Sequence, residues 1–258
     1  MPTSSKIVKY NLEKDKNVLG KDWLVTYGGY FSDEQNIKLF IKLIKPYLPK
    51  RKLDILYVAS ASGLLGEKLI KNLKQGQLTI VDISQKHLDE NKNPKTIKIC
   101  ADLLKMKLGK KFDLIIMRSS LDYFPTKKLQ VKILQIISHH LKANGLFINQ
   151  PAYIPNILDR DVISDAYTLS PKIGDRFFQS LDINEIYMNA GFSIPKMIGK
   201  GKQLVLSEKD HIKRYKLKDS DIRSIKRILS KATQYASVTK DGYQLKFDFP
   251  IFLTTLKK

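Results

Sequence analysis

A turn of small residues and an acidic residue downstream have the types and spacing of a ligand-binding pair. The turn, Ala59-Ser60-Ala61-Ser62-Gly63, follows a short apolar run. Its small side chains let the backbone approach a ligand closely, and of its residues only Gly63 takes a positive φ without strain. Asp82 ends the next apolar run, where a ribose diol would need a bidentate acceptor. The sequence therefore predicts that residues 59–63 and Asp82, with Ile83 beside it, contact a nucleotide-like cofactor.

Alternating strands and helices are expected to position these residues. The apolar runs are short, which is typical of strands buried on both faces of a parallel sheet. The pattern predicts an α/β fold, a Rossmann-like, doubly wound, mostly parallel seven-stranded sheet with helices on both faces. Strands are expected at 55–58, 78–81, 96–100, 112–117, 146–149 and near 251–256, and helices at 64–73, 85–90, 127–141 and 182–189.

Three further segments complete the predicted organisation. Residues 1–50 read as a helical and aromatic lead that covers the cofactor site, and residues 51–258 as the cofactor-binding domain. Within that domain the periodic pattern dissolves at about 151–180, which is expected to be a lid. A basic amphipathic helix is expected at about 219–236, and most such helices lay a solvated face on the core.

Composition narrows the function classes. The 258 residues carry 46 Lys and Arg against 25 Asp and Glu, a formal charge of +21. Lysines spread along the whole chain favour a generally basic protein over a nucleic-acid binder, although nucleic acid stays an alternative. No apolar run is long enough to span a membrane and no secretory signal is recognised, so a cytoplasmic protein is expected. No metal site is predicted, and the single Cys100 is expected to be a buried thiol.

The motifs together resemble the class I S-adenosylmethionine (SAM)-dependent methyltransferases, particularly those of ubiquinone and menaquinone biosynthesis. The first motif of that family matches Ile55-Leu56-Tyr57-Val58-Ala59-Ser60-Ala61-Ser62-Gly63 without gaps. The similarity continues in order through about residue 195, at Val81-Asp82-Ile83-Ser84, Ala101-Asp102-Leu103, 112–124, 141–145 and 189–192. The resemblance implies the predicted fold, SAM as cofactor and S-adenosylhomocysteine as product.

The resemblance also implies roles for individual residues. Residues 59–63 would contact the methionine part, Asp82 the ribose and Asp102 the adenine, with Leu103 beside it. The remaining candidates line the same pocket: Arg118 and Ser119 next to the cofactor, Tyr27 and Tyr30 folded over it, and Asp122 and Tyr123 facing the methyl group as general base or acceptor-orienting groups. Helix capping by Asp82 and Asp102, capping and packing by Asp122 and Tyr123, and core packing by Tyr27 and Tyr30 are the alternative interpretations.

Two departures from the family pattern keep other functions open. Tyr57 replaces an acidic residue that helps to hold the methionine end, and Ala61 replaces a glycine. The first hypothesis is a methyltransferase acting on a small, anionic or aromatic molecule. The second is an inactive methyltransferase-fold scaffold, and the third a nucleic-acid methyltransferase. An NAD(P)-dependent dehydrogenase is the remaining alternative, because Ala61-x-Gly63-x-x-Gly66 resembles a degenerate nicotinamide-binding turn. The sequence does not predict the oligomeric state.

Overall fold

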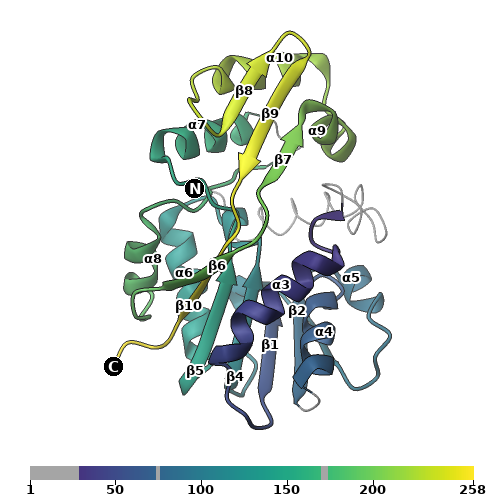
Figure 1. Cartoon of the computed structure of the whole chain (residues 1–258), viewed down its shortest axis with the longest axis vertical. Helices are drawn as coiled ribbons and strands as arrows, with labels where there is room; N and C mark the ends of the chain where they lie inside the picture. Colours follow the sequence, from purple (N-terminus) through teal and green to yellow (C-terminus); the bar gives the residue numbers. More distant parts are fainter. Residues whose placement is uncertain (1–28, 74–75, 170–173) are drawn as a thin grey trace.

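The computed structural model describes residues 29–73, 76–169 and 174–258, arranged around two sheets (Figure 1). The helices are α3 (Glu34–Ile44), α4 (Leu64–Leu73), α5 (Gln85–Asp89), α6 (Lys127–His139), α7 (Ile157–Thr168), α8 (Ile183–Asn189), α9 (Glu208–Tyr215) and α10 (Asp219–Leu229), with short 3-10 turns η2 (Lys45–Tyr47), η3 (Leu103–Lys105) and η4 (Leu121–Tyr123). The strands are β1 (Asp54–Val58), β2 (Gln77–Asp82), β3 (Ile97–Cys100), β4 (Phe112–Arg118), β5 (Leu141–Gln150), β6 (Lys196–Lys200), β7 (Leu204–Ser207), β8 (Ala236–Thr239), β9 (Gly242–Phe247) and β10 (Pro250–Thr254). No helix among these residues combines the length and apolar composition that crossing a membrane requires.

The larger sheet has seven strands in the order β3-β2-β1-β4-β5-β10-β6. Strands β3, β2, β1, β4 and β5 pair in parallel, whereas β10 runs antiparallel to both of its neighbours. The predicted mostly parallel seven-stranded sheet is therefore confirmed. The strand order reverses between β1 and β4, and in sheets of this kind ligands bind outside the carboxyl ends of the strands at such a point.

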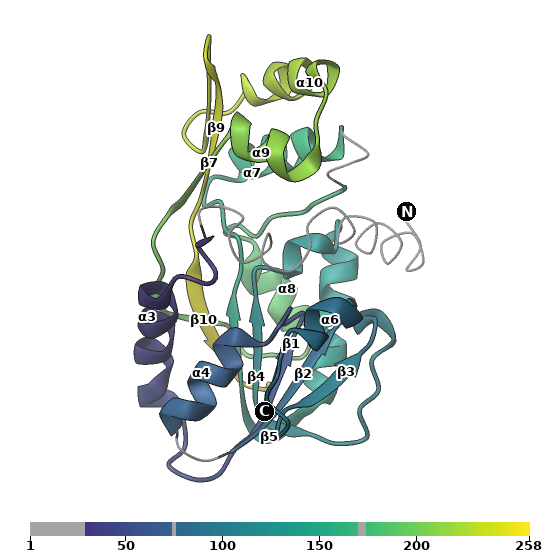
Figure 2. The same cartoon turned by 90° about the vertical axis from the view of Figure 1, so that its right-hand side faces the viewer.

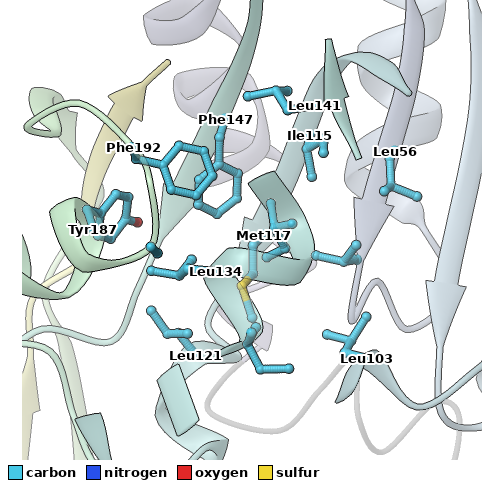
Figure 3. Packing of buried hydrophobic residues seen from close by; sticks show 14 of the residues in the cluster. Leu56, Leu103, Ile115, Met117, Leu121, Leu134, Leu141, Phe147, Tyr187 and Phe192 are labelled. Carbon is cyan, nitrogen blue, oxygen red and sulfur yellow. The ribbon is translucent and has the colours of Figure 1, made fainter. Parts of the chain in front are cut away.

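Helices cover both faces of this sheet, as the sequence predicts (Figure 2). On one face α3 and α4 bury residues such as Phe40, Ile44 and Leu69 against β1 and β2. On the other face α6 and α8 pack over side chains that include Met117 and Phe147, which Figure 3 shows from close by. Along β4, Ile115 and Met117 face α6 and α8, whereas Leu114 and Ile116 face α3 and α4. Because side chains alternate along a strand, Arg118 is expected on the α3 face.

A smaller three-stranded sheet, β7-β9-β8, lies beyond the carboxyl ends of the large-sheet strands. It packs with α7, α9 and α10 around a core of its own. Within this core the buried His211 lies between the hydroxyls of Tyr167 and Tyr243, each 3.0 Å from a ring nitrogen. Asp159, at the start of α7, accepts four hydrogen bonds from residues 233–235 and so joins α7 to β8.

Some elements differ from their prediction. Where the sequence indicates a loop at about 151–180, the structure has α7, whose short apolar face was not recognised. The strands of the small sheet were not predicted, although buried and more exposed residues alternate along β7 and β9, because each strand has only four to six residues. The prediction that Cys100 is buried is wrong, because β3 is an edge strand and the thiol is exposed.

Candidate cofactor site

The turn after β1 is held in an unusual backbone conformation. Its φ angles are positive at Ala59 (48°), Ala61 (49°) and Gly63 (75°), so two residues with side chains adopt the left-handed region that favours glycine. A Cβ on Gly63 would lie 2.9 Å from the Ile80 side chain, which excludes any larger residue without rearrangement. Left-handed backbone at non-glycine residues persists only where the surroundings impose it, and it clusters at functional sites.

Asp82 joins this turn to the end of β2. Its Oδ2 accepts a hydrogen bond from the Ala61 amide at 2.7 Å, and its Oδ1 accepts one from the Ser84 amide at 3.0 Å. Nδ1 of the buried His87 lies 3.7 Å from Oδ1. Asp82 is only 8% exposed. The structure thus brings together the predicted turn and the predicted acid, and it fixes the carboxylate where β1 and β2 both end.

Asp102 lies after the neighbouring strand, β3. Its Oδ1 accepts a hydrogen bond from the Leu104 amide at 3.0 Å, so it caps the η3 turn that buries Leu103. The capping role proposed as the alternative is therefore present in the structure. Because a carboxylate offers about four acceptor positions, capping leaves room for a ligand contact at the same group.

Arg118 ends β4 and is buried, with 6% of its surface exposed. Its Nε donates to Gln150 Oε1 at 2.7 Å and its Nη1 donates to the Phe31 carbonyl at 3.0 Å. Its guanidinium lies 5.1 Å from the centroid of the Phe31 ring. The pKa of Arg118 is lowered because burial disfavours the charge. Ser119 follows with a positive φ of 48°, and its amide donates to the Gln150 carbonyl at 2.8 Å.

Tyr57 of β1 is buried, and the two charged groups that act on its hydroxyl are Arg118 and Asp82. Burial raises the pKa of its hydroxyl, and the charges of Arg118 and Asp82 act on it in opposite directions. Tyr57 therefore lies within electrostatic reach of both the end of β2 and the end of β4. The sequence marks Tyr57 only as a departure from the family pattern, whereas the structure shows that its strand, β1, lies between the two strands that end at Asp82 and Arg118.

Asp122 and Tyr123, in the η4 turn after β4, contact a residue that the sequence analysis missed. Arg176 Nη1 donates to Asp122 Oδ2 at 2.8 Å, and the Arg176 guanidinium lies 3.2 Å from the centroid of the Tyr123 ring. Burial would lower the pKa of Arg176, but the neighbouring Tyr123 and Asp122 raise it well above its usual value. Asp122 Oδ1 has no hydrogen-bond partner within the described ranges. Only the fold reveals this pair, because 54 residues separate the two side chains.

Of the two tyrosines predicted to cover the cofactor, Tyr30 lies within the described residues. It is buried against Phe31 and Phe249, and its hydroxyl donates to the Lys202 carbonyl at 2.6 Å. Burial raises the pKa of Tyr30 to about 12. Tyr30 therefore packs into the core of the small sheet. The other predicted lead residue, Tyr27, lies outside the described residues.

The positions that the structure describes hold no group of three histidine, cysteine or acidic side chains placed to bind a metal ion. Apart from Tyr30, the described candidates gather at the carboxyl ends of β1, β2, β3 and β4. They comprise three carboxylates, a strained turn and a buried arginine. Such an arrangement suits a ligand with hydroxyl donors at one end and an anionic group at the other.

Comparison with known proteins agrees with this arrangement. Residues 55–145 match the family described as "Methyltransferase domain". No curated protein sequence matches the chain. Among solved structures, the YcgJ protein from Bacillus subtilis has a TM-score of 0.67 at 15% identity, over 88% of this chain and 99% of that one.

Two further structures share the fold. A putative methyltransferase from Bacillus halodurans has a TM-score of 0.61 at 13% identity, over 83% of this chain and 95% of the other. The magnesium protoporphyrin IX methyltransferase from Synechocystis, with bound S-adenosylhomocysteine, has a TM-score of 0.55 at 16% identity, over 97% of this chain and 100% of the other. The family match supports the predictions of a methyltransferase and of SAM as its cofactor. Residues 55–145 thus match a methyltransferase domain, and the chain has the Rossmann-like fold of these methyltransferase structures.

Proposed function

We propose that this protein transfers a methyl group from SAM to a small-molecule acceptor. The observation that carries the proposal is the hydrogen bond between the Ala61 amide and Asp82, because it places the close-approach turn and the ribose-binding candidate side by side at the ends of β1 and β2. The match of residues 55–145 to a methyltransferase domain supports it.

The residues present fit this cofactor. The turn at 59–63 keeps small side chains, and Gly63 has no space for a Cβ. Asp82 would accept hydrogen bonds from the ribose hydroxyls while its carboxylate stays anchored by the Ala61 and Ser84 amides. Asp102 and Leu103 would border the adenine at the end of β3. An anchored carboxylate loses little conformational freedom when the ligand binds.

SAM, when bound, supplies a methyl group activated by a sulfonium. The chain's own residues mainly have to align the acceptor and exclude water. Asp122, buried with one oxygen free of hydrogen bonds to described residues, would accept a hydrogen bond or a proton from an acceptor hydroxyl or amine. Arg176 fixes the orientation of that carboxylate through its other oxygen.

The proposal of a small acceptor, anionic or aromatic, rests on the surroundings of Asp122. The segment that carries Arg176 follows α7 and lies against η4, so the Phe177 amide donates to the Asp122 carbonyl at 3.0 Å. The Arg176 guanidinium, stacked on the Tyr123 ring, therefore lies beside Asp122. One structural neighbour is named for a porphyrin substrate, magnesium protoporphyrin IX. The cytoplasmic location stays a prediction.

A transfer assay tests the proposal and separates its rivals. Purified protein is incubated with methyl-labelled SAM and cell extract, and the extract is then divided into small-molecule, protein and nucleic-acid fractions. We expect label in the small-molecule fraction, abolished by excess S-adenosylhomocysteine. Label in the nucleic-acid fraction would favour the nucleic-acid methyltransferase instead. No label in any fraction, although the protein binds SAM, would favour the inactive scaffold.

A further inference from the structure

Arg118 is a buried cation without a buried anion to match it. The described carboxylates form no ion pair with it, and Nη2 has no hydrogen-bond partner among the described residues. Its other two nitrogens donate to uncharged oxygens, of Gln150 and Phe31. A buried charge is costly unless it is paired, and a free guanidinium nitrogen adds the cost of an unmade hydrogen bond. The arrangement is therefore suited to an anion that the described residues do not supply.

The position of Arg118 indicates where that anion belongs. Arg118 ends β4, which pairs directly with β1 below the turn at 59–63. Tyr57 is on β1, which pairs on one side with β4, ending at Arg118, and on the other with β2, ending at the ribose-binding candidate Asp82. Arg118, which carries the unpartnered Nη2, is thus at the same carboxyl ends of the strands as Asp82, two strands nearer the centre of the sheet. A nucleoside ligand held at Asp82 would extend its amino-acid part in this direction.

The local charge is also reversed relative to the family that this chain resembles. There an acidic residue helps to hold the methionine end, and here its position is occupied by the uncharged Tyr57 with Arg118 beside it. An acid would favour the ammonium of an amino acid, whereas a guanidinium favours its carboxylate. The loss of the acid and the presence of the arginine together change which group of the same ligand is recognised.

We propose that Nη2 of Arg118 binds the carboxylate at the amino-acid end of the cofactor and thereby replaces the missing acid at position 57 as the main charged contact of that subsite. This inference rests on the proposed function, since it assumes a SAM-type ligand. The packing of the guanidinium near the Phe31 and Phe40 rings, at 5.1 and 5.9 Å, holds the side chain in place for this contact. Arg118 also donates to the carbonyl of Phe31, so ligand binding at this subsite is coupled to the position of the segment before α3.

The test compares two ligands that differ in the amino-acid part. S-Adenosylhomocysteine carries the carboxylate, and 5′-methylthioadenosine retains the adenosine and the sulfur without it. Calorimetric titrations use the wild-type chain, Arg118→Met, Arg118→Lys and, as matched control, Arg223→Met. The control removes the same charge from an exposed position on α10. Circular dichroism and thermal unfolding check that each variant folds.

We expect the wild-type chain to bind S-adenosylhomocysteine more tightly than 5′-methylthioadenosine. Arg118→Met should weaken the first by about 10- to 100-fold, as loss of a charge-assisted hydrogen bond does, and change the second by less than about threefold. Arg118→Lys should recover part of the difference, and Arg223→Met should leave both affinities unchanged. If Arg118→Met does not fold, the wild-type preference and the Arg118→Lys variant carry the test.

Two results overturn the inference while leaving the proposed function intact. One is a wild-type chain that binds both ligands equally well, since the carboxylate then contributes nothing. The other is a folded Arg118→Met variant in which both affinities stay the same or fall equally, because Arg118 would then only shape the site. If the wild-type chain binds neither ligand, the proposed function itself fails.

Discussion

The ion pair between Arg176 and Asp122 predicts a large and specific loss of stability when one partner is removed. In Arg176→Met, the Asp122 carboxylate loses its cationic partner at a site that is 5% exposed, and its Oδ1 already has no described hydrogen-bond partner. The variant also loses the 2.8 Å hydrogen bond to Oδ2 and the stacking on Tyr123. Breaking a buried pair in this way costs about 3–5 kcal/mol. We therefore expect the free energy of unfolding to fall by about that amount.

A double-mutant cycle separates the charge effect from lost packing. Asp122→Leu together with Arg176→Met removes both charges, so the double variant should recover at least about 2 kcal/mol relative to the sum of the single losses. Urea unfolding at pH 7, followed by circular dichroism, measures all four proteins, and equal m-values confirm that the unfolding transition stays comparable. A loss below about 1 kcal/mol in Arg176→Met, or single losses that simply add, would refute the tight buried pair.

Three further changes test other parts of the structure. Gly63→Ala should cost about 2–4 kcal/mol of unfolding free energy, because it adds a Cβ 2.9 Å from Ile80 at a φ of 75°. The control Gly109→Ala, at a φ of 64° with open space around it, should cost only about 1 kcal/mol, and equal losses in urea unfolding would contradict this prediction. Burial, assisted by Arg214, lowers the pKa of His211 to about 3, so the stabilisation by the neutral ring is present above pH 6.5 and is lost as the pH falls toward 3. The unfolding free energy should drop by about 1.4 kcal/mol per pH unit below 6.5. His211→Gln should flatten that slope in urea titrations between pH 7 and 4.5. Despite burial, hydrogen bonds from Arg51 and the Asp54 amide hold the pKa of Asp113 at about 2. Its stabilisation of about 2 kcal/mol is therefore present above pH 4 and is lost as the pH falls toward 2. The difference in unfolding free energy between wild type and Asp113→Asn should shrink from pH 5 to pH 3, and a constant difference would argue against the pKa shift.

The sequence predicts the large sheet well because its signals are local. Short apolar runs identify β1, β2 and β4, and the spacing between the turn at 59–63 and Asp82 predicts a shared ligand site, where the structure joins the two by a hydrogen bond. The strain at Ala59 and Ala61 was not predicted, because nothing in the residue types requires positive φ there. In that turn the surrounding fold decides the backbone conformation.

Contacts between distant segments could not be predicted. Arg176 reaches Asp122 across 54 residues, and Arg118 reaches Phe31 across 87, so neither pairing leaves a periodic signal. The small sheet was missed because its strands are short and partly exposed. The exposed Cys100 shows a related limit, since an apolar run does not reveal that its strand lies at an edge. A single buried cation such as Arg118 becomes informative only when its partners are known.

The central claim, that this domain holds SAM at the turn formed by residues 59–63 and at Asp82, is tested most directly by calorimetric titration with S-adenosylhomocysteine, SAM and NADPH. The same titrations on Asp82→Asn remove the carboxylate charge with little change of shape, and Asp89→Asn serves as a control at an exposed position of α5. We predict micromolar binding of the first two ligands by the wild-type chain and by the control, at least about 10-fold weaker binding by Asp82→Asn, and no binding of NADPH. Binding of NADPH alone, or binding of S-adenosylhomocysteine that is unaffected in Asp82→Asn, would contradict the account.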